Sequence, residues 1–274
     1  MNEILSRQLA LDYCCSPEDV SDNANHFTLH SFREGRRRFR ESEECFLKIA
    51  VVNGKLLFTG SPAIIDWCRQ KYADTISDWF FDAQTLYELE TKIREYGYAV
   101  ETVHPFFLPD THPDRDHGRD HDRDPVSDPD RADHDAPVRT GRCAYGIRWY
   151  DHVSIEQFRG DPRFTEAFTF LEEAPDVLGV AAVKDPGEGG AEEILGMAGA
   201  SADSPTMWQI GINIAPSARQ KGIAKHLVTL LKNEIIRKGK LPYYGTSMSH
   251  IASQKVALGA GFLPAWAELA TKRM

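Results

Sequence analysis

Residues 208–228, WQIGINIAPSARQKGIAKHLV, indicate the fold of this chain more strongly than any other stretch. An alternating apolar segment, typical of a strand, passes through a Pro-containing turn into a long amphipathic helix. A helix N-terminus carries free backbone N–H groups and the positive end of the helix dipole, so this junction can hold a phosphate group. Gly222 suits that role because a bulky side chain would keep phosphate oxygens away from the amides. Taken alone, the segment is also compatible with an ordinary packing turn.

The pattern Arg-x-x-Gly-x-Ala at this junction resembles the acyl-CoA signature of the GNAT superfamily of N-acetyltransferases. In that superfamily the turn cradles the CoA pyrophosphate, and the strand before it presents backbone groups to pantetheine and the acyl carbonyl. The resemblance therefore implies acetyl-CoA as co-substrate. The residues expected to contact it are Ile212, Ile214, Arg219, Gln220, Lys221, Gly222, Ile223 and Ala224.

A second motif follows at the distance that the superfamily requires. Relatives have a parallel strand, then Asn-x-x-Ala/Ser-x-x-Leu/Val-Tyr, then Gly-Phe; here residues 243–248 are the expected strand. Ser253 falls on the Ala/Ser position, which adds it to the residues expected at acetyl-CoA. Two positions depart from the pattern, because His250 replaces the Asn and Ala257 replaces the Tyr that protonates the leaving thiolate in many relatives. The standard general acid is therefore missing, although the resemblance spans about residues 145–270.

Attack of an amine on a thioester requires a neutral amine and a proton for the departing thiolate. A primary amine has a pKa of about 10.4 in water, so a base has to help remove its proton at neutral pH. Asp203 is the nearest carboxylate in sequence, but it is equally an ordinary turn residue. For the acid we favour Tyr244 over His250, which could instead cap a helix; strand alternation points Tyr243 to the other side of the sheet.

The element pattern predicts an α/β (α+β) fold of the GNAT type. We expect a mixed, largely antiparallel sheet flanked by helices and splayed between its central parallel strands, preceded by a small α+β domain. The expected organisation is an accessory α+β domain (1–109), an acidic Asp/His/Arg-rich disordered linker (110–140) and a GNAT-like acetyltransferase domain (141–274).

Local signals place the individual elements. Ser16 and Pro17 predict a helix start, and Asn53-Gly54 predicts a hairpin turn. A helix that begins near residue 223 should stop at Gly239 and leave His226 in solvent. Strands are expected at 27–32, 45–52, 55–58, 103–108, 177–183 and 193–200 and from about 207, with a turn at 185–190; further helices are expected at 62–72, 83–96, 154–158 and 162–171.

Charge and composition exclude some functions. The net charge of −9 disfavours broad nucleic-acid binding, and residues 110–137 supply most of that charge through ten Asp against four Arg. This segment lacks the apolar residues needed to offset its ordering entropy. Its histidines (His112, His117, His121 and His134) could suggest a metal site, but ligands on a flexible chain bind weakly, and we expect no metal. Five cysteines without metal-type spacing indicate packing rather than a disulfide framework.

The sequence therefore predicts an N-acetyltransferase acting on a small-molecule or peptide amine. We expect it to be cytoplasmic and away from membranes, because it lacks both a secretory signal and a run of eighteen apolar residues. A non-catalytic acetyl-CoA-binding regulatory module is the first alternative, because of Ala257. The second is an RNA-associated protein acting through an Arg-rich hairpin at residues 33–40, although a charged hairpin edge is also an ordinary structural device.

Overall fold

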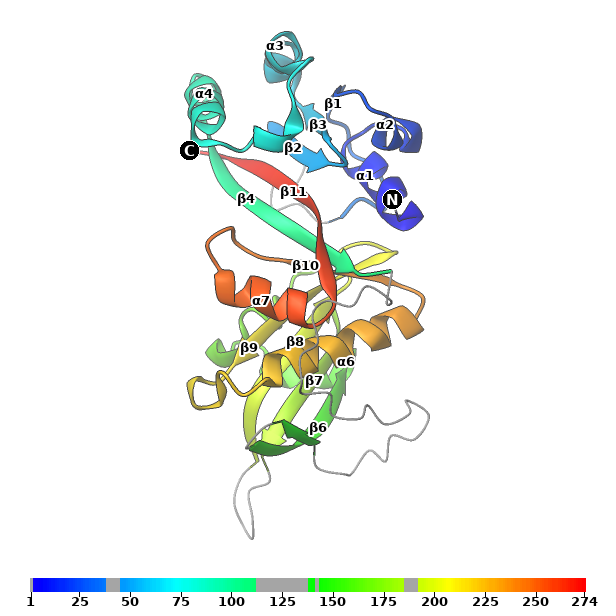
Figure 1. Ribbon diagram of the computed structural model, residues 1–274, viewed down its shortest axis with the longest axis vertical. Helices are drawn as coiled ribbons and strands as arrows, with labels where there is room; N and C mark the ends of the chain where they lie inside the picture. The colour runs from blue at the N-terminus through cyan, green and yellow to red at the C-terminus, as the bar shows by residue number, and fades with distance from the viewer. Residues whose placement is uncertain (1, 38–44, 112–137, 141–142, 185–191) are drawn as a thin grey trace.

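The structure, a computed structural model, describes residues 2–37, 45–111, 138–140, 143–184 and 192–274 (Figure 1). Its centre is an 11-stranded sheet with the order β1-β3-β2-β11-β4-β10-β9-β8-β7-β6-β5. The strands are β1 (His26–Leu29), β2 (Leu47–Val52), β3 (Lys55–Gly60), β4 (Tyr98–Pro109), β5 (Val138–Thr140), β6 (Cys143–Asp151), β7 (Asp176–Lys184), β8 (Glu193–Ser201), β9 (Met207–Ile214), β10 (Leu241–Gly245) and β11 (Phe262–Arg273). The α-helices are α1 (Glu3–Asp12), α2 (Pro17–Ser21), α3 (Pro62–Tyr72), α4 (Ala83–Arg94), α5 (His152–Ile155), α6 (Ile223–Arg237) and α7 (Ile251–Gly259).

The sheet is mixed and mostly antiparallel, and its central parallel pair is β9 and β10. Their pairing runs from Leu241 opposite Met207 to Tyr244 opposite Ile210. β10 ends at Gly245, whereas β9 continues to Ile214 and there pairs only with β8 among the described strands. The sheet is therefore splayed beyond this point, and the predicted fold class is confirmed.

Strands from both halves of the chain form one continuous sheet. β11 lies between β2 and β4, with Glu268 opposite Ala50 on one side and opposite His104 on the other. Figure 1 shows β4 and β11 running side by side from the end of the molecule near α4 to the level of β10. The sequence pattern did not predict a strand over residues 262–273. The domain boundaries at 109 and 141 stay a prediction, but the sheet crosses them.

Several local predictions in the first half are confirmed. The Ser16 hydroxyl accepts the Asp19 backbone N–H at 3.1 Å and so caps α2. Asn53 and Gly54 both have positive φ angles, 49° and 75°, in the tight turn between β2 and β3. α3 covers residues 62–72 as predicted, and α4 ends two residues before the predicted end at 96.

The predicted helix over 162–171 is wrong. Only Pro162–Phe164 forms a single 3-10 turn. The backbone N–H groups of Thr169 and Phe170 bond to the Asp176 carboxylate at 3.1 and 2.7 Å instead of continuing a helix, and Phe170 has a φ of 52°. The apolar period that suggested a helix comes from side chains buried in one cluster, which include Phe164, Ala167 and Phe168.

α6 packs on the sheet through its apolar stripe and ends before Gly239, whose φ is 72°. Leu227 and Leu231 are fully buried, which stabilises the helix by about 1.5–3 kcal/mol for each such side chain. The prediction that His226 faces solvent is wrong. Its ring is half-buried, and its Nδ1 lies 2.8 Å from the Tyr145 hydroxyl. Burial lowers the pKa of His226.

Some predictions fall on residues that the structure does not describe. Residues 112–137, with the histidines at which we expect no metal, and the turn at 185–190 lie outside the described residues. Four of the five cysteines, Cys14, Cys15, Cys45 and Cys68, are free thiols. Within the described part of the chain, no helix combines the length and the apolar character needed to cross a membrane.

Candidate active site

The turn before α6 is shaped by two residues with left-handed backbone. Gln220 has a φ of 60°, and Gly222, the N-cap residue of α6, has a φ of 78°. Glycine adopts this conformation without strain, which explains the residue at position 222. No side chain caps the helix, so the first N–H groups of α6 have neither an intrahelical partner nor a capping partner among the described residues. This terminus can therefore bind an anion.

The turn opens into a cleft of about 1150 Å³ that reaches both halves of the sheet. The structure brings all of the predicted site residues to its walls, although their roles stay predictions. They are Asp203, Ile212, Ile214, Arg219, Gln220, Lys221, Gly222, Ile223, Ala224, Tyr244, His250 and Ser253.

The splayed end of β9 presents different groups to its two sides. Ile210, Ile212 and Ile214 pack in the cluster that contains the apolar stripe of α6. Gly211 and Asn213 instead contact the segment 165–169, which lines the cleft on the opposite side. The strand thus separates a helix side, towards α6 and α7, from a loop side.

Tyr244 lies on the helix side of this gap. Its hydroxyl is 2.9 Å from the Ser253 hydroxyl on α7, and its ring contacts Phe262. Burial raises the pKa of Tyr244, because the phenolate would be poorly solvated. The phenol therefore keeps its proton at neutral pH, as a proton donor must.

Tyr243 points to the loop side, as strand alternation predicts, and it is paired with Asp203. The Tyr243 hydroxyl donates to one Asp203 oxygen at 2.5 Å, and the Ser201 hydroxyl donates to the other at 2.6 Å. Asp203 is buried, with 3% of its surface exposed. A carboxylate and a phenol are thus linked directly beside the splay.

The second candidate acid and the missing tyrosine occupy different environments. His250 is the N-cap residue of α7, but its side chain makes no capping hydrogen bond, and the exposed residue lines the cleft. Ala257 is fully buried in the core cluster beneath α6 and α7. A methyl group at this position supplies packing and no proton.

The far wall of the cleft contains a buried ion cluster. Arg37 donates to Asp12 and to Glu268, and the Lys48 ammonium lies 3.7 Å from Glu268. Burial alone would raise the pKa of Glu268, but the neighbouring Arg37 and Lys48 charges more than offset that effect and lower it to about 2. These charges are therefore compensated within the protein.

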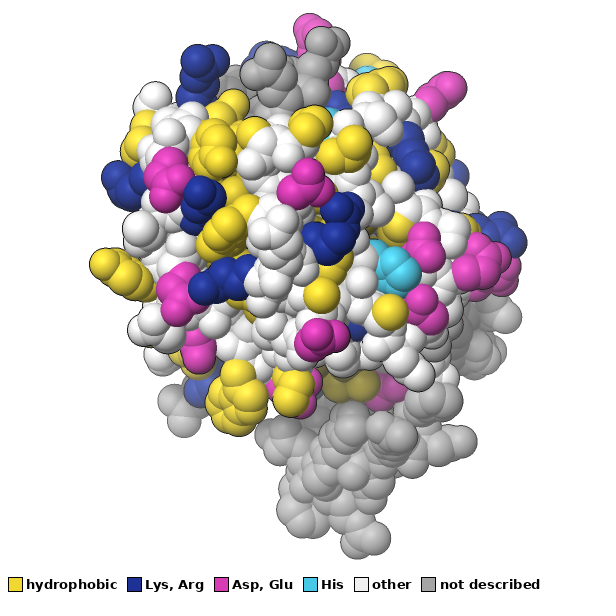
Figure 2. All heavy atoms as spheres, turned by 90° about the horizontal axis from the view of Figure 1, so that it is seen from above, with side chains coloured by type: hydrophobic (Ala, Val, Ile, Leu, Met, Phe, Trp, Pro, Cys, Tyr) yellow, Lys and Arg dark blue, Asp and Glu magenta, His cyan; other side chains and the backbone are white. Residues whose placement is uncertain are grey.

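The same arginine belongs to the proposed RNA-binding hairpin, for which the structure gives no support. Residues 33–37 form a turn rather than a hairpin, and 38–40 lie outside the described residues. Arg33 donates to the Ala10 and Cys15 carbonyls, so it faces the protein, as Arg37 does. Figure 2 shows Lys and Arg side chains interspersed with Asp and Glu over the described part of the visible face.

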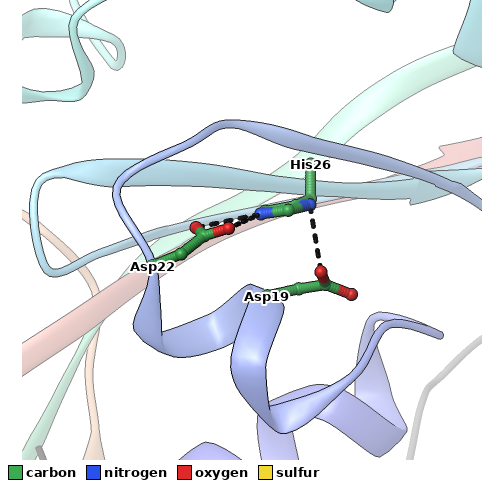
Figure 3. Close-up of side chains that lie close together, drawn as sticks. All are labelled: Asp19, Asp22 and His26. Atoms are coloured by element: carbon green, nitrogen blue, oxygen red, sulfur yellow. Dashed lines mark hydrogen bonds and ion pairs between the residues drawn. The ribbon is translucent and has the colours of Figure 1, made fainter.

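Asp19, Asp22 and His26 form a cluster of possible metal ligands within 4.8 Å of one another (Figure 3). The Lys55 ammonium lies 2.7 Å from Asp22 and 2.6 Å from the Asp19 carbonyl. Lys55 lowers the pKa of Asp22 well below its usual range. Because a lysine already supplies the positive charge here, we interpret the cluster as a structural ion pair rather than a metal site.

Sequence reasoning missed the loop that closes the other side of the cleft. The Asn213 side-chain oxygen accepts the backbone N–H groups of Glu166 and Ala167 at 2.9 and 2.8 Å. A Cβ at Gly211 would lie 1.8 Å from the Glu166 carbonyl oxygen, and one at Gly199 would lie 2.0 Å from that of Ala167. The glycines within two predicted strands were the available signal, since they mark a close backbone approach.

An uncapped helix terminus beside a splayed sheet, with ionisable side chains on both sides of the gap, is suited to group transfer from a phosphate-bearing donor. Residues 141–262 match the model of the Acetyltransferase (GNAT) family. This part of the chain is a GNAT-family acetyltransferase domain. None of the curated proteins matches the chain.

Solved structures of other acetyltransferases are similar to this one. A GNAT-family acetyltransferase from Novosphingobium aromaticivorans is 14% identical with a TM-score of 0.38, over 64% of this chain and 66% of that chain. A GCN5-related N-acetyltransferase-like protein from Streptococcus suis is 13% identical with a TM-score of 0.46, over 99% and 100%. The aminoglycoside N-acetyltransferase AAC(6')-Iy in complex with CoA is 26% identical with a TM-score of 0.32, over 43% and 92%.

Proposed function

We propose that this protein is an acetyl-CoA-dependent N-acetyltransferase that transfers the acetyl group to a primary amine by direct attack in a ternary complex. The observation that carries the proposal is the shared cleft, which joins the uncapped α6 terminus, the splay and two tyrosine-centred pairs. The family match over residues 141–262 supports the same conclusion.

The donor would lie across the helix terminus and the edge of β9. The turn from Arg219 to Ala224 offers backbone N–H groups and two cationic side chains to the pyrophosphate. Beyond Ile210, β9 has no β10 partner, so its backbone at 212 and 214 is available to the pantetheine amides. Ser253 lies on α7 beside this path, where its hydroxyl already contacts Tyr244.

The acceptor would bind on the loop side. Its ammonium group must lose a proton before the nitrogen can attack, and Asp203 is the proposed base, reached through the Tyr243 hydroxyl. The nitrogen then forms a bond to the thioester carbonyl carbon. Collapse of the tetrahedral intermediate breaks the C–S bond, and the nitrogen gives up a further proton to solvent as the amide is released.

The thiolate would receive its proton from Tyr244, on the opposite side of the gap. Ser253 holds this phenol in place, and burial keeps it protonated. His250 is the alternative donor, because it also lines the cleft. The thiolate can also depart as the free anion, since thiols have pKa values of about 8.5.

The turn can be tested with two matched glycine substitutions. Gly222→Glu places bulk and negative charge at the start of α6 and should weaken acetyl-CoA binding at least tenfold, about 1.4 kcal/mol. Gly239→Glu is the control, because Gly239 also has a positive φ of 72°, lies past the other end of α6 and has nothing within 4 Å of an added Cβ. Equal affinity in the two folded variants, measured by calorimetry, would refute the assignment of the turn.

Ala257 favours one other function, a non-catalytic module that binds acetyl-CoA. The two functions differ in turnover. A panel of amines with thiol release as the readout separates them, because the module would bind acetyl-CoA without releasing CoA in the presence of any amine.

A further inference from the structure

Glu166 is a carboxylate at the cleft whose backbone is fixed on the sheet. Its N–H bonds to Asn213, and its carbonyl lies against Gly211 so closely that no side chain fits between them. The following N–H, of Ala167, bonds to the same Asn213 oxygen. The carboxylate is therefore carried on a rigid support rather than on a free loop.

The buried carboxylates of the cleft already have partners. Asp203 is bound by two hydroxyls, and Glu268 by two cations. Glu166, in contrast, is exposed, and within the described residues its carboxylate makes neither a hydrogen bond nor an ion pair. Glu166 lines the same cleft as Tyr244. Burial raises the pKa of Tyr244, and the negative charge of Glu166 adds to that effect.

We propose that Glu166 binds a second ammonium group of the acceptor, so that the preferred acceptors are diamines or polyamines. This inference rests on the proposed N-acetyltransferase function. The acceptor nitrogen that reacts must be neutral, whereas a second amine in the same molecule keeps its charge at neutral pH. The Arg37 and Lys48 charges are balanced within the far wall, and the Asp203 oxygens are occupied by two hydroxyls. Glu166 therefore supplies an exposed negative charge on the loop side that a second ammonium group can reach.

The test compares 1,4-diaminobutane with 1-aminobutane as acceptors for the full chain, with thiol release as the readout. We expect the wild type to favour the diamine at least tenfold in kcat/KM. Glu166→Gln should make kcat/KM nearly equal for the two amines. It should lower kcat/KM for the diamine about tenfold and leave kcat/KM for the monoamine within about twofold of the wild-type value. Added salt should reduce the wild-type preference but not change the variant.

Glu172→Gln is the matched control, because Glu172 is an exposed glutamate a few residues further on that does not line the cleft. It should keep the wild-type preference. An equal loss for both amines in Glu166→Gln would overturn the inference and make Glu166 a base or a structural residue. Equal wild-type rates for the two amines would also overturn it, while the proposed function would stand. No thiol release with any amine of the wider panel would refute the proposed function itself.

Discussion

Gly211→Ala tests whether the loop over the splay controls acceptor turnover. The substitution adds one methyl group whose carbon would lie 1.8 Å from the Glu166 carbonyl oxygen and 2.9 Å from its carbon. Both atoms belong to the backbone, so the clash cannot be relieved by turning a side chain. The loop has to move away from β9 by more than an ångström to restore an ordinary contact.

The size of the effect follows from that displacement. Overpacking of this kind costs about 1–3 kcal/mol of stability. A shift of about 1 Å in a group that positions a substrate can lower the rate by up to about 100-fold. We therefore expect kcat/KM for the amine to fall about 10- to 100-fold, whereas the KM for acetyl-CoA should stay within about twofold, because the turn before α6 is untouched.

Steady-state kinetics with each substrate varied in turn, together with thermal unfolding, measure both effects. Gly146→Ala is the matched control: it adds the same methyl group to β6, where the nearest atom is a Val183 methyl at 3.4 Å. This variant should behave as the wild type. If Gly211→Ala also kept wild-type acceptor kinetics, the loop would have no part in positioning the acceptor.

Three further predictions concern single side chains. Tyr244→Phe should lower kcat about tenfold or more with unchanged acetyl-CoA affinity. A wild-type kcat in this variant, combined with a large loss in His250→Ala, would transfer the role of proton donor to His250. Glu268→Ala should lower the free energy of unfolding by about 3–5 kcal/mol in urea titrations, because it leaves Arg37 and Lys48 short of a buried counter-charge. The pKa of Glu268 is depressed to about 2, so this difference in stability should be full above about pH 4.5 and shrink as the pH falls from about 4.5 to about 2. A pH-independent difference would contradict the ion-pair explanation. The pKa of His226 is also depressed, so the stability that His226 contributes is present above its unfolded pKa of about 6.5 and is lost as the pH falls below it. The melting-temperature advantage of the wild type over His226→Gln should therefore narrow from about pH 7.5 to about pH 5. A constant difference in melting temperature would count against this explanation.

The sequence predicted those parts of the site that are encoded locally. The turn around Gly222 was predictable because a strand, a positive-φ glycine and an amphipathic helix follow one another within a few residues. The opposite orientations of Tyr243 and Tyr244 followed from strand alternation alone. The fold class followed in the same way, from periodicity combined with two spaced motifs.

The parts that were missed depend on contacts between distant residues. The apolar period at 162–171 indicates which side chains are buried, and a folded-back loop can bury them as well as a helix can. The close approach of this segment to Gly211 distinguishes the loop from the helix. Arg37 looked like an exposed basic residue because its partners Asp12 and Glu268 are 25 and 231 positions away. No local pattern carries that information.

The position of β11 affects the order in which the chain can fold. A ribosome delivers residues 26–109 well before residues 262–273, yet among the described strands β2 is joined to β4 only through β11. Until that strand arrives, the facing edges of β2 and β4 are open, and open strand edges invite pairing with other chains. We therefore expect the early strands to wait for the acetyltransferase part of the chain, so that docking of β11 completes both halves of the sheet in one late, long-range step.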